Sequence, residues 1–139
     1  MIQIIAGEKG KGKTKILIEK VNSAVREAKG SIIYLDKNNK HMYELSNRIR
    51  LINVKDYFID NSSEFVGFIC GLISQDHDLE TIYLDSFLRI ANTDVSNMES
   101  ILNKLEVLSK EFVVDFVISV SLNEIDIPES ARKYVVVSL

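Results

Sequence analysis

Apolar residues along the chain follow two alternating patterns: short runs rich in β-branched residues, and longer stretches whose apolar positions recur every three or four residues. The short runs predict strands over residues 2–6, 31–35, 51–54, 81–85, 112–121 and 134–139. The longer stretches predict helices over residues 13–28, 43–47, from 61 onward and 95–110. Strands that alternate with helices are typical of an α/β fold with a mainly parallel sheet. We therefore expect a three-layer α/β/α sandwich around a sheet of five to six strands.

No linker, repeat or biased tract interrupts these elements, and 139 residues are about the length of one domain. We expect a single domain over residues 1–139. One cysteine excludes an intrachain disulfide framework and points to a reducing compartment. No apolar run approaches the ~20 residues of a membrane span, and the first ten residues lack the features of a secretory signal. We expect a cytoplasmic protein without a membrane span.

The chain is mildly acidic, with 17 Lys+Arg against 20 Asp+Glu and a formal net charge of −3. Proteins that bind nucleic acids or anionic membrane surfaces through charge are usually basic. The composition therefore gives no evidence for either kind of partner.

One segment carries most of the functional information. Residues 7–14 match the phosphate-binding pattern G-x-x-x-x-G-K-[ST] at every fixed position, directly after a predicted strand and at the start of a predicted helix. A chance match in a chain of this length has a probability of roughly 0.5%, which makes a lysine-rich turn that binds nothing the weaker interpretation. We expect all eight residues to form a nucleotide site: Gly7, Glu8, Lys9, Gly10, Lys11, Gly12, Lys13 and Thr14.

The residue types of this segment suit a triphosphate. Glycine permits the positive φ angles with which successive N–H groups can point at phosphate oxygens. The new helix adds its positive dipole end. Lys13 supplies a charge toward the outer phosphates, and the Thr14 hydroxyl can ligate Mg²⁺. Solvated charge remains the commoner explanation for Lys9 and Lys11.

A second motif follows in the predicted strand Ile82-Tyr83-Leu84-Asp85, where apolar residues end in an aspartate. Together with Gly7–Thr14, it makes the chain resemble the P-loop NTPases, whose Walker B motif has this form. An aspartate at the carboxyl end of a central parallel strand projects into the ligand crevice. The resemblance implies that Lys13 and Asp85 are catalytic, and that Thr14 and Asp85 hold the Mg²⁺ that accompanies ATP. Taken alone, Asp85 is equally well a turn or helix-capping residue.

The order of the predicted strands resembles the RecA-like branch of that superfamily. This branch has the strand order 5-1-4-3-2, which would place residues 112–121 beside the strand that precedes Gly7 and residues 134–139 on its other side. The arrangement is similar to the cores of secretion and twitching-motility ATPases and to small bacterial ATP-binding proteins. After Ser121 the chain lacks the N-K-x-D motif of Ras-like GTPases, so we expect ATP rather than GTP.

The RecA-like pattern is broken at one position. Members usually carry a glutamate beside the Walker B aspartate, whereas Ser86 follows Asp85 here. Glu8 and Glu124 are candidates for positioning a water molecule, although solvated charge explains both more simply. We expect hydrolysis to be slow, dependent on a partner, or absent.

Other residues are candidates for contact with the outer phosphate. Ser119 and Ser121 resemble the polar sensor position of the family, with backbone capping as the alternative. Arg132 and Lys133 are candidates to reach the phosphates of this or a neighbouring subunit, although solvated charge is the commoner explanation. A homo-oligomer or a protein partner is therefore compatible with the sequence.

Three functions remain open on this evidence. The first is an ATPase or an ATP-driven switch that uses the Gly7–Thr14 loop and Asp85. The second is a nucleotide-binding regulatory or scaffold module that does not hydrolyse its ligand. The third is a small-molecule or nucleoside kinase, in which Asp36 at the end of a strand would bind the acceptor hydroxyl. A turn aspartate explains Asp36 equally well.

Overall fold

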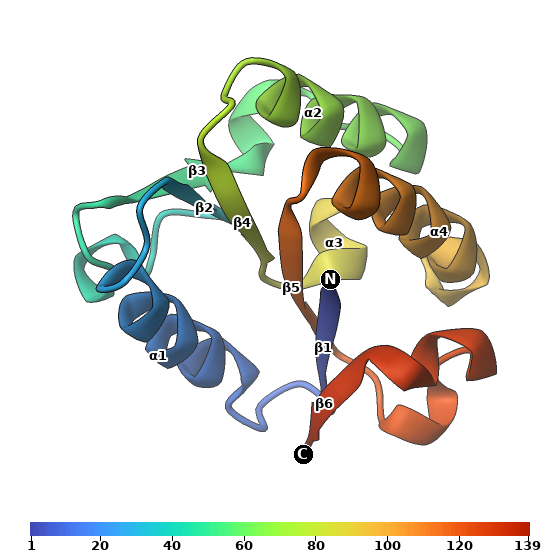
Figure 1. The fold of residues 1–139 in the computed structure, drawn as a ribbon. Coiled ribbons are helices and arrows are strands. Elements are labelled where there is room, and N and C mark those ends of the chain that lie inside the picture. Colours follow the sequence, from blue (N-terminus) through green and yellow to red (C-terminus); the bar gives the residue numbers. More distant parts are fainter.

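The computed structural model describes residues 1–139 as an alternation of strands and helices (Figure 1). The strands are β1 (Ile2–Ala6), β2 (Ser31–Asp36), β3 (Ile49–Asn53), β4 (Leu79–Leu84), β5 (Asp115–Val120) and β6 (Val135–Ser138). The α-helices are α1 (Lys13–Val25), α2 (Ser62–Ser74), α3 (Phe87–Ile90) and α4 (Val95–Phe112). Short 3-10 helices are η1 (Met42–Glu44), η2 (Val54–Tyr57), η3 (Glu124–Asp126) and η4 (Glu129–Tyr134).

All six strands form one sheet in the order β3-β2-β4-β5-β1-β6, and every neighbouring pair is parallel. The central strands are buried on both faces, which explains their nearly continuous apolar sequences. Because the strands are parallel, their carboxyl ends meet at one edge of the sheet. The loop after β1 and the residues that follow β2, β4 and β5 therefore gather along that edge.

Helices cover both faces of the sheet. Helix α1 packs on one face, and α2, α3 and α4 lie on the other (Figure 1). Leu17 and Val21 of α1 contact a cluster that includes Tyr34 and Tyr83 of the sheet. The opposite face holds the larger core, which includes buried residues of α2 and α4. The expected α/β fold with three layers is confirmed, and the sheet is wholly parallel.

Several element boundaries differ from the predictions. Helix α1 ends at Val25 and not at residue 28, and residues 26 and 27 form a turn whose amides still bond to Ser23 and Ala24 of the helix. Strand β5 begins at Asp115 and not at 112. Phe112 is still helical and Val113, with a φ of 55°, ends α4 in the left-handed conformation. Apolar periodicity could not separate a helix end from a strand start in this apolar run.

One helix, α3, was not predicted, and it follows β4 immediately. With four residues it is too short to show a helical apolar period. Its Phe87 and Ile90 are buried in the larger core. No helix of the chain combines the length and apolar character needed to cross a membrane.

Candidate functional site

The loop between β1 and α1 depends on glycine at two positions. Gly10 and Gly12 have φ angles of 87° and 92°, in the left-handed region that favours glycine. No atom lies within 4 Å of the place where a Cβ would stand at either residue. The backbone conformation, and not lack of space, therefore requires glycine here. Gly12 is also the N-cap of α1 and makes no side-chain cap bond, so the first N–H groups of the helix remain available to a ligand.

Lys13, the first residue of α1, is a buried cation. Its side chain is only 7% exposed, and its Nζ donates a hydrogen bond of 2.9 Å to the carbonyl oxygen of Glu8. Burial lowers the pKa of the Lys13 ammonium group, the charge of Asp85 opposes this shift, and the charge of Lys37 adds to it. No carboxylate lies within ion-pair distance of Lys13. The ammonium group of Lys13 therefore lies beside the loop without a carboxylate counterion in the protein.

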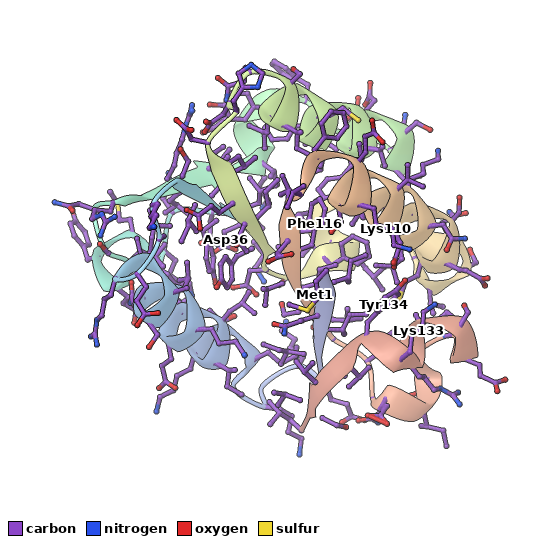
Figure 2. All side chains as sticks on the ribbon, viewed as in Figure 1. Met1, Asp36, Lys110, Phe116, Lys133 and Tyr134 are labelled. Carbon is purple, nitrogen blue, oxygen red and sulfur yellow. The ribbon has the colours of Figure 1, made fainter.

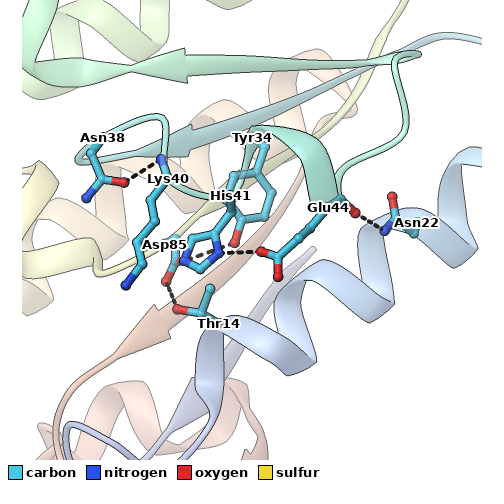
Figure 3. A network of polar contacts seen from close by, with 8 residues as sticks. All are labelled: Thr14, Asn22, Tyr34, Asn38, Lys40, His41, Glu44 and Asp85. Carbon is cyan, nitrogen blue, oxygen red and sulfur yellow. Dashed lines mark hydrogen bonds and ion pairs between the residues drawn. The ribbon is translucent and has the colours of Figure 1, made fainter.

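Asp85 follows β4 and accepts hydrogen bonds from three hydroxyl groups. Oδ1 accepts from Thr14 Oγ1 at 3.2 Å and Oδ2 accepts from Tyr34 Oη at 2.8 Å (Figure 3). Oδ1 also accepts from Ser119 Oγ at 2.8 Å. The carboxylate is 2% exposed. Burial, followed by the charge of Asp85 and the hydrogen bond to it, raises the pKa of the Tyr34 phenol, which therefore remains a donor. These contacts fix the orientation of the carboxylate.

A cleft of about 470 Å³ opens between the loop and the segment after β4. Its lining residues come from the loop and the start of α1, from the segments that follow β2, β4 and β5, and from α3: Lys9, Gly10, Gly12, Lys13, Thr14, Lys37, Asp85, Ser86, Leu88, Arg89 and Ser121. Four of these side chains are cationic and one is a carboxylate. The cleft is therefore suited to an anion, although the chain as a whole is acidic.

The structure brings most of the predicted site residues together. Those that line the cleft are Lys9, Gly10, Gly12, Lys13, Thr14, Asp85 and Ser121. Those that do not line it are Gly7, Glu8, Lys11 and Ser119. Ser119 lies behind Asp85, where its hydroxyl donates to Asp85 and accepts from the Ser86 amide at 2.8 Å. Ser119 thus orients Asp85, and of the two sensor candidates Ser121 alone faces the cleft.

The predicted water-positioning residues lie outside the cleft. Glu8 Oε1 accepts a hydrogen bond of 2.8 Å from Asn123 Nδ2, which joins the loop to the segment after β5. Glu124 is exposed in η3. Asp85 is consequently the one carboxylate that lines the cleft.

The two basic candidates near the end of the chain are occupied elsewhere. The Arg132 guanidinium donates to the carbonyl oxygens of Ile127 at 3.0 Å and Ile125 at 2.7 Å. Lys133 Nζ lies 5.2 Å from the centre of the Tyr134 ring, on the η4 side of the molecule and away from Asp36 (Figure 2). Neither residue lines the cleft.

Four lining residues and one supporting residue were missed by sequence reasoning. Lys37 and Ser86 directly follow the Asp residues at the ends of β2 and β4, and Leu88 and Arg89 lie in α3. Their position after carboxyl strand ends was a usable signal, but it required the strand order. Ser86 has a φ of 59°, an uncommon conformation for a residue other than glycine. Nothing in the sequence identified Tyr34 as a residue that supports the site, because a tyrosine within an apolar strand is usually a core residue.

Asp36 ends β2 next to Asp85 but has a different environment. It is 3% exposed, its Oδ1 accepts from the Lys37 amide at 2.7 Å, and its Oδ2 has no hydrogen-bond partner. Burial, and then the charge of Asp85, raises the pKa of the Asp36 carboxyl group. Asp36 does not line the cleft, so the structure does not bring it to a position where an acceptor hydroxyl would bind.

Comparison with known proteins adds no relative. No protein-family model matches the chain, and no curated protein matches its sequence.

Proposed function

We propose that this chain is an Mg²⁺-dependent ATP-binding protein of the P-loop NTPase superfamily, which acts as an ATPase or an ATP-driven switch. One observation carries the proposal: Thr14 at the start of α1 and Asp85 after β4, 71 residues apart in sequence, meet at 3.2 Å in a cationic cleft beside Lys13. A loop whose only role was to cap α1 would not require the contact between Thr14 and Asp85.

Each part of the cleft has a role in holding Mg–ATP. The left-handed Gly10 and Gly12 and the free N–H groups of α1 would surround phosphate oxygens. Lys13 would contribute a full charge to the outer phosphates. Thr14 and Asp85 offer the hard oxygen atoms that Mg²⁺ prefers. The chain has no group of three metal-ligating His, Cys, Asp or Glu side chains, so this donor set fits an ion that arrives with phosphate and water ligands. When bound, Mg²⁺ neutralises phosphate charge.

The sheet order supports the RecA-like branch. Strand β5 lies between β1 and β4, and β6 lies on the other side of β1. With β3 taken as an additional edge strand, this is the arrangement that the order 5-1-4-3-2 describes. The absence of N-K-x-D after Ser121 supports ATP over GTP.

The cleft favours slow turnover. Asp85 is its one carboxylate, and three hydroxyl groups already donate to it. A general base must reach the attacking water within hydrogen-bond distance, and no second carboxylate is placed to do so. We propose a switch whose hydrolysis is slow unless a protein partner or another copy of the chain supplies a group that positions the attacking water.

The same observation favours a second candidate function, a nucleotide-binding module that never hydrolyses its ligand. Nothing favours the kinase alternative, because Asp36 does not line the cleft.

Nucleotide binding is tested by thermal unfolding of the parent chain with ATP, ADP, GTP and a non-hydrolysable ATP analogue, with and without Mg²⁺. A ligand at 100 times its Kd stabilises the native state by about 2.7 kcal/mol, so we expect a clear rise in Tm with Mg–ATP. Lys13→Ala should abolish the rise. Lys15→Ala, an exposed lysine of the same helix that does not line the cleft, is the matched control. An equal rise in both variants contradicts the proposal.

Phosphate release distinguishes the two candidate functions. Steady turnover above the rate in buffer, absent from Asp85→Asn, would support the ATPase or switch. Nucleotide binding without any release would support the non-hydrolysing module.

A further inference from the structure

Two cations of the cleft come from outside the Gly7–Thr14 loop. Lys37 directly follows β2, and Arg89 lies in α3, directly after the Asp85–Ser86 turn. The ion pairs of the whole chain join Met1 to Asp115, His41 to Glu44 and Lys110 to Glu106, and none of them involves a residue that lines the cleft. Lys37 and Arg89 therefore have no anionic partner in the protein.

The placement of Lys37 is defined by its neighbours. Its Nζ lies 3.4 Å from Ser86 Oγ, and the Ser86 amide is fixed by its bond to Ser119. The charge of Lys37 also contributes to the lowered pKa of Lys13, which indicates that the two ammonium groups share one electrostatic environment. Like charges held together in one cleft repel, and a bound polyanion removes that repulsion.

The sheet places Lys37 on the far side of Asp85 from the loop, whereas Arg89 reaches the cleft from α3. In the order β2-β4-β5-β1, the strand that ends at Asp85 lies between β2 and β1. Strand spacing of about 4.8 Å separates β2 from β1 by roughly 14 Å. Lys13 and Lys37 thus enter the cleft from opposite sides, with the Thr14–Asp85 contact between them. A ligand that touches both walls must carry negative charge along its length.

We propose that Lys37 and Arg89 form a second phosphate-binding wall, which contacts the terminal phosphate of ATP opposite Lys13, while the backbone of the Gly7–Thr14 loop holds the inner phosphates. This inference rests on the proposed function and extends it. It makes the triphosphate the preferred ligand over the diphosphate, and it assigns that preference to residues of this chain, without a basic residue from a neighbouring subunit.

The test is a set of Kd values for a non-hydrolysable ATP analogue and for ADP, measured by calorimetry with Mg²⁺ at constant ionic strength. The parent chain is compared with Lys37→Ala, Arg89→Ala and the double variant. Lys40→Ala is the matched control, because Lys40 is an exposed lysine of the same β2–β3 connection that does not line the cleft. Charge-assisted hydrogen bonds are worth about 1.5–3 kcal/mol, and every 1.4 kcal/mol is tenfold in Kd.

We expect each single variant to weaken binding of the triphosphate analogue by at least about tenfold and binding of ADP by less than about twofold. Lys40→Ala should leave both values unchanged. If the variants weaken both ligands equally, or neither, the second wall is refuted while the proposed function stands. If the parent chain binds neither nucleotide, the proposed function fails and this inference fails with it.

Discussion

The ends of β4 and β2 hold two aspartates in closely related positions but with different hydrogen-bond environments. The strands are neighbours, Leu84 pairs with Leu35, and Asp85 and Asp36 follow these residues. Both side chains are almost fully buried. Asp85 accepts from three hydroxyl groups, whereas Asp36 has one oxygen with no partner. At the first site three donors satisfy the carboxylate oxygens, whereas at the second site burial of an oxygen without a partner makes the anion costly. Burial therefore does not identify a functional acid, but the donors arranged around it do.

The largest effect is expected from removal of the partnered carboxylate. Asp85→Ala leaves the hydroxyl groups of Thr14, Tyr34 and Ser119 without their acceptor, and we expect it to lower the free energy of unfolding by about 3 kcal/mol. Asp36→Ala removes a carboxylate with a single amide donor and should cost much less. Urea unfolding of both variants measures the difference. Equal losses would show that the donors around Asp85 contribute nothing to stability.

Tyr34→Phe sharpens the comparison by removing one donor and keeping the ring. The ring stacks on Tyr83 with centroids 6.2 Å apart, so packing is retained. Loss of the hydroxyl leaves Asp85 Oδ2 without a partner, and we expect a loss of about 1.5 kcal/mol in the free energy of unfolding. The Mg²⁺ concentration needed for half-maximal nucleotide stabilisation should also rise, because the carboxylate is less well oriented. A variant that loses stability with no change in its Mg²⁺ requirement would limit Tyr34 to a structural role.

The same contrast between partnered and unpartnered groups applies to two arginines. The Arg132 side chain donates to two carbonyl oxygens near η3, whereas the Arg89 side chain lines the cleft and has no hydrogen-bond partner in the protein. We expect Arg132→Ala to lower the free energy of unfolding by about 1 kcal/mol and to leave nucleotide affinity unchanged. Arg89→Ala should change stability by less than about 0.5 kcal/mol. Urea unfolding and nucleotide titration of both variants are needed, and a reversed pattern would contradict the assignment of the two residues.

Features of the fold and the site that consecutive residues encode were predicted from the sequence, whereas features that depend on contacts between distant residues were not. The strand–loop–helix unit around Gly10, Gly12 and Lys13 is encoded in consecutive residues, and its element types were predicted correctly. The alternating patterns predicted a mainly parallel sheet, and the sheet is wholly parallel. Lys37 was missed because it reaches the cleft only through the order of strands in the sheet, which is a long-range property, and Arg89 was missed because α3 is too short to show an apolar period. Arg132 was considered for a ligand contact because a sequence does not show that nearby carbonyl groups already occupy its guanidinium.

The smallest effect is expected at Asp36, and it depends on pH. Its folded-state pKa is raised above the ordinary value of 3.8, chiefly by burial. Between the unfolded and folded pKa values, the native state therefore holds a proton that the unfolded chain has released, and stability falls as the pH rises through this interval. Above the folded pKa the penalty is constant. Asp36→Asn retains an acceptor for the Lys37 amide and carries no charge, so it should be more stable than the parent by about 0.5 kcal/mol at neutral pH.

The pH profile separates this electrostatic gain from a change in packing. The difference in the free energy of unfolding between Asp36→Asn and the parent should be smallest near pH 3.8, increase with pH, and then become constant. Urea unfolding across this range measures it, and every other titrating group cancels in the difference to the extent that it is independent of Asp36. A difference that does not vary with pH would mean that the pKa of Asp36 is the same in the folded and the unfolded chain, so that the fold imposes no penalty on its anion. The contrast with Asp85 would then lie in hydrogen-bond geometry alone.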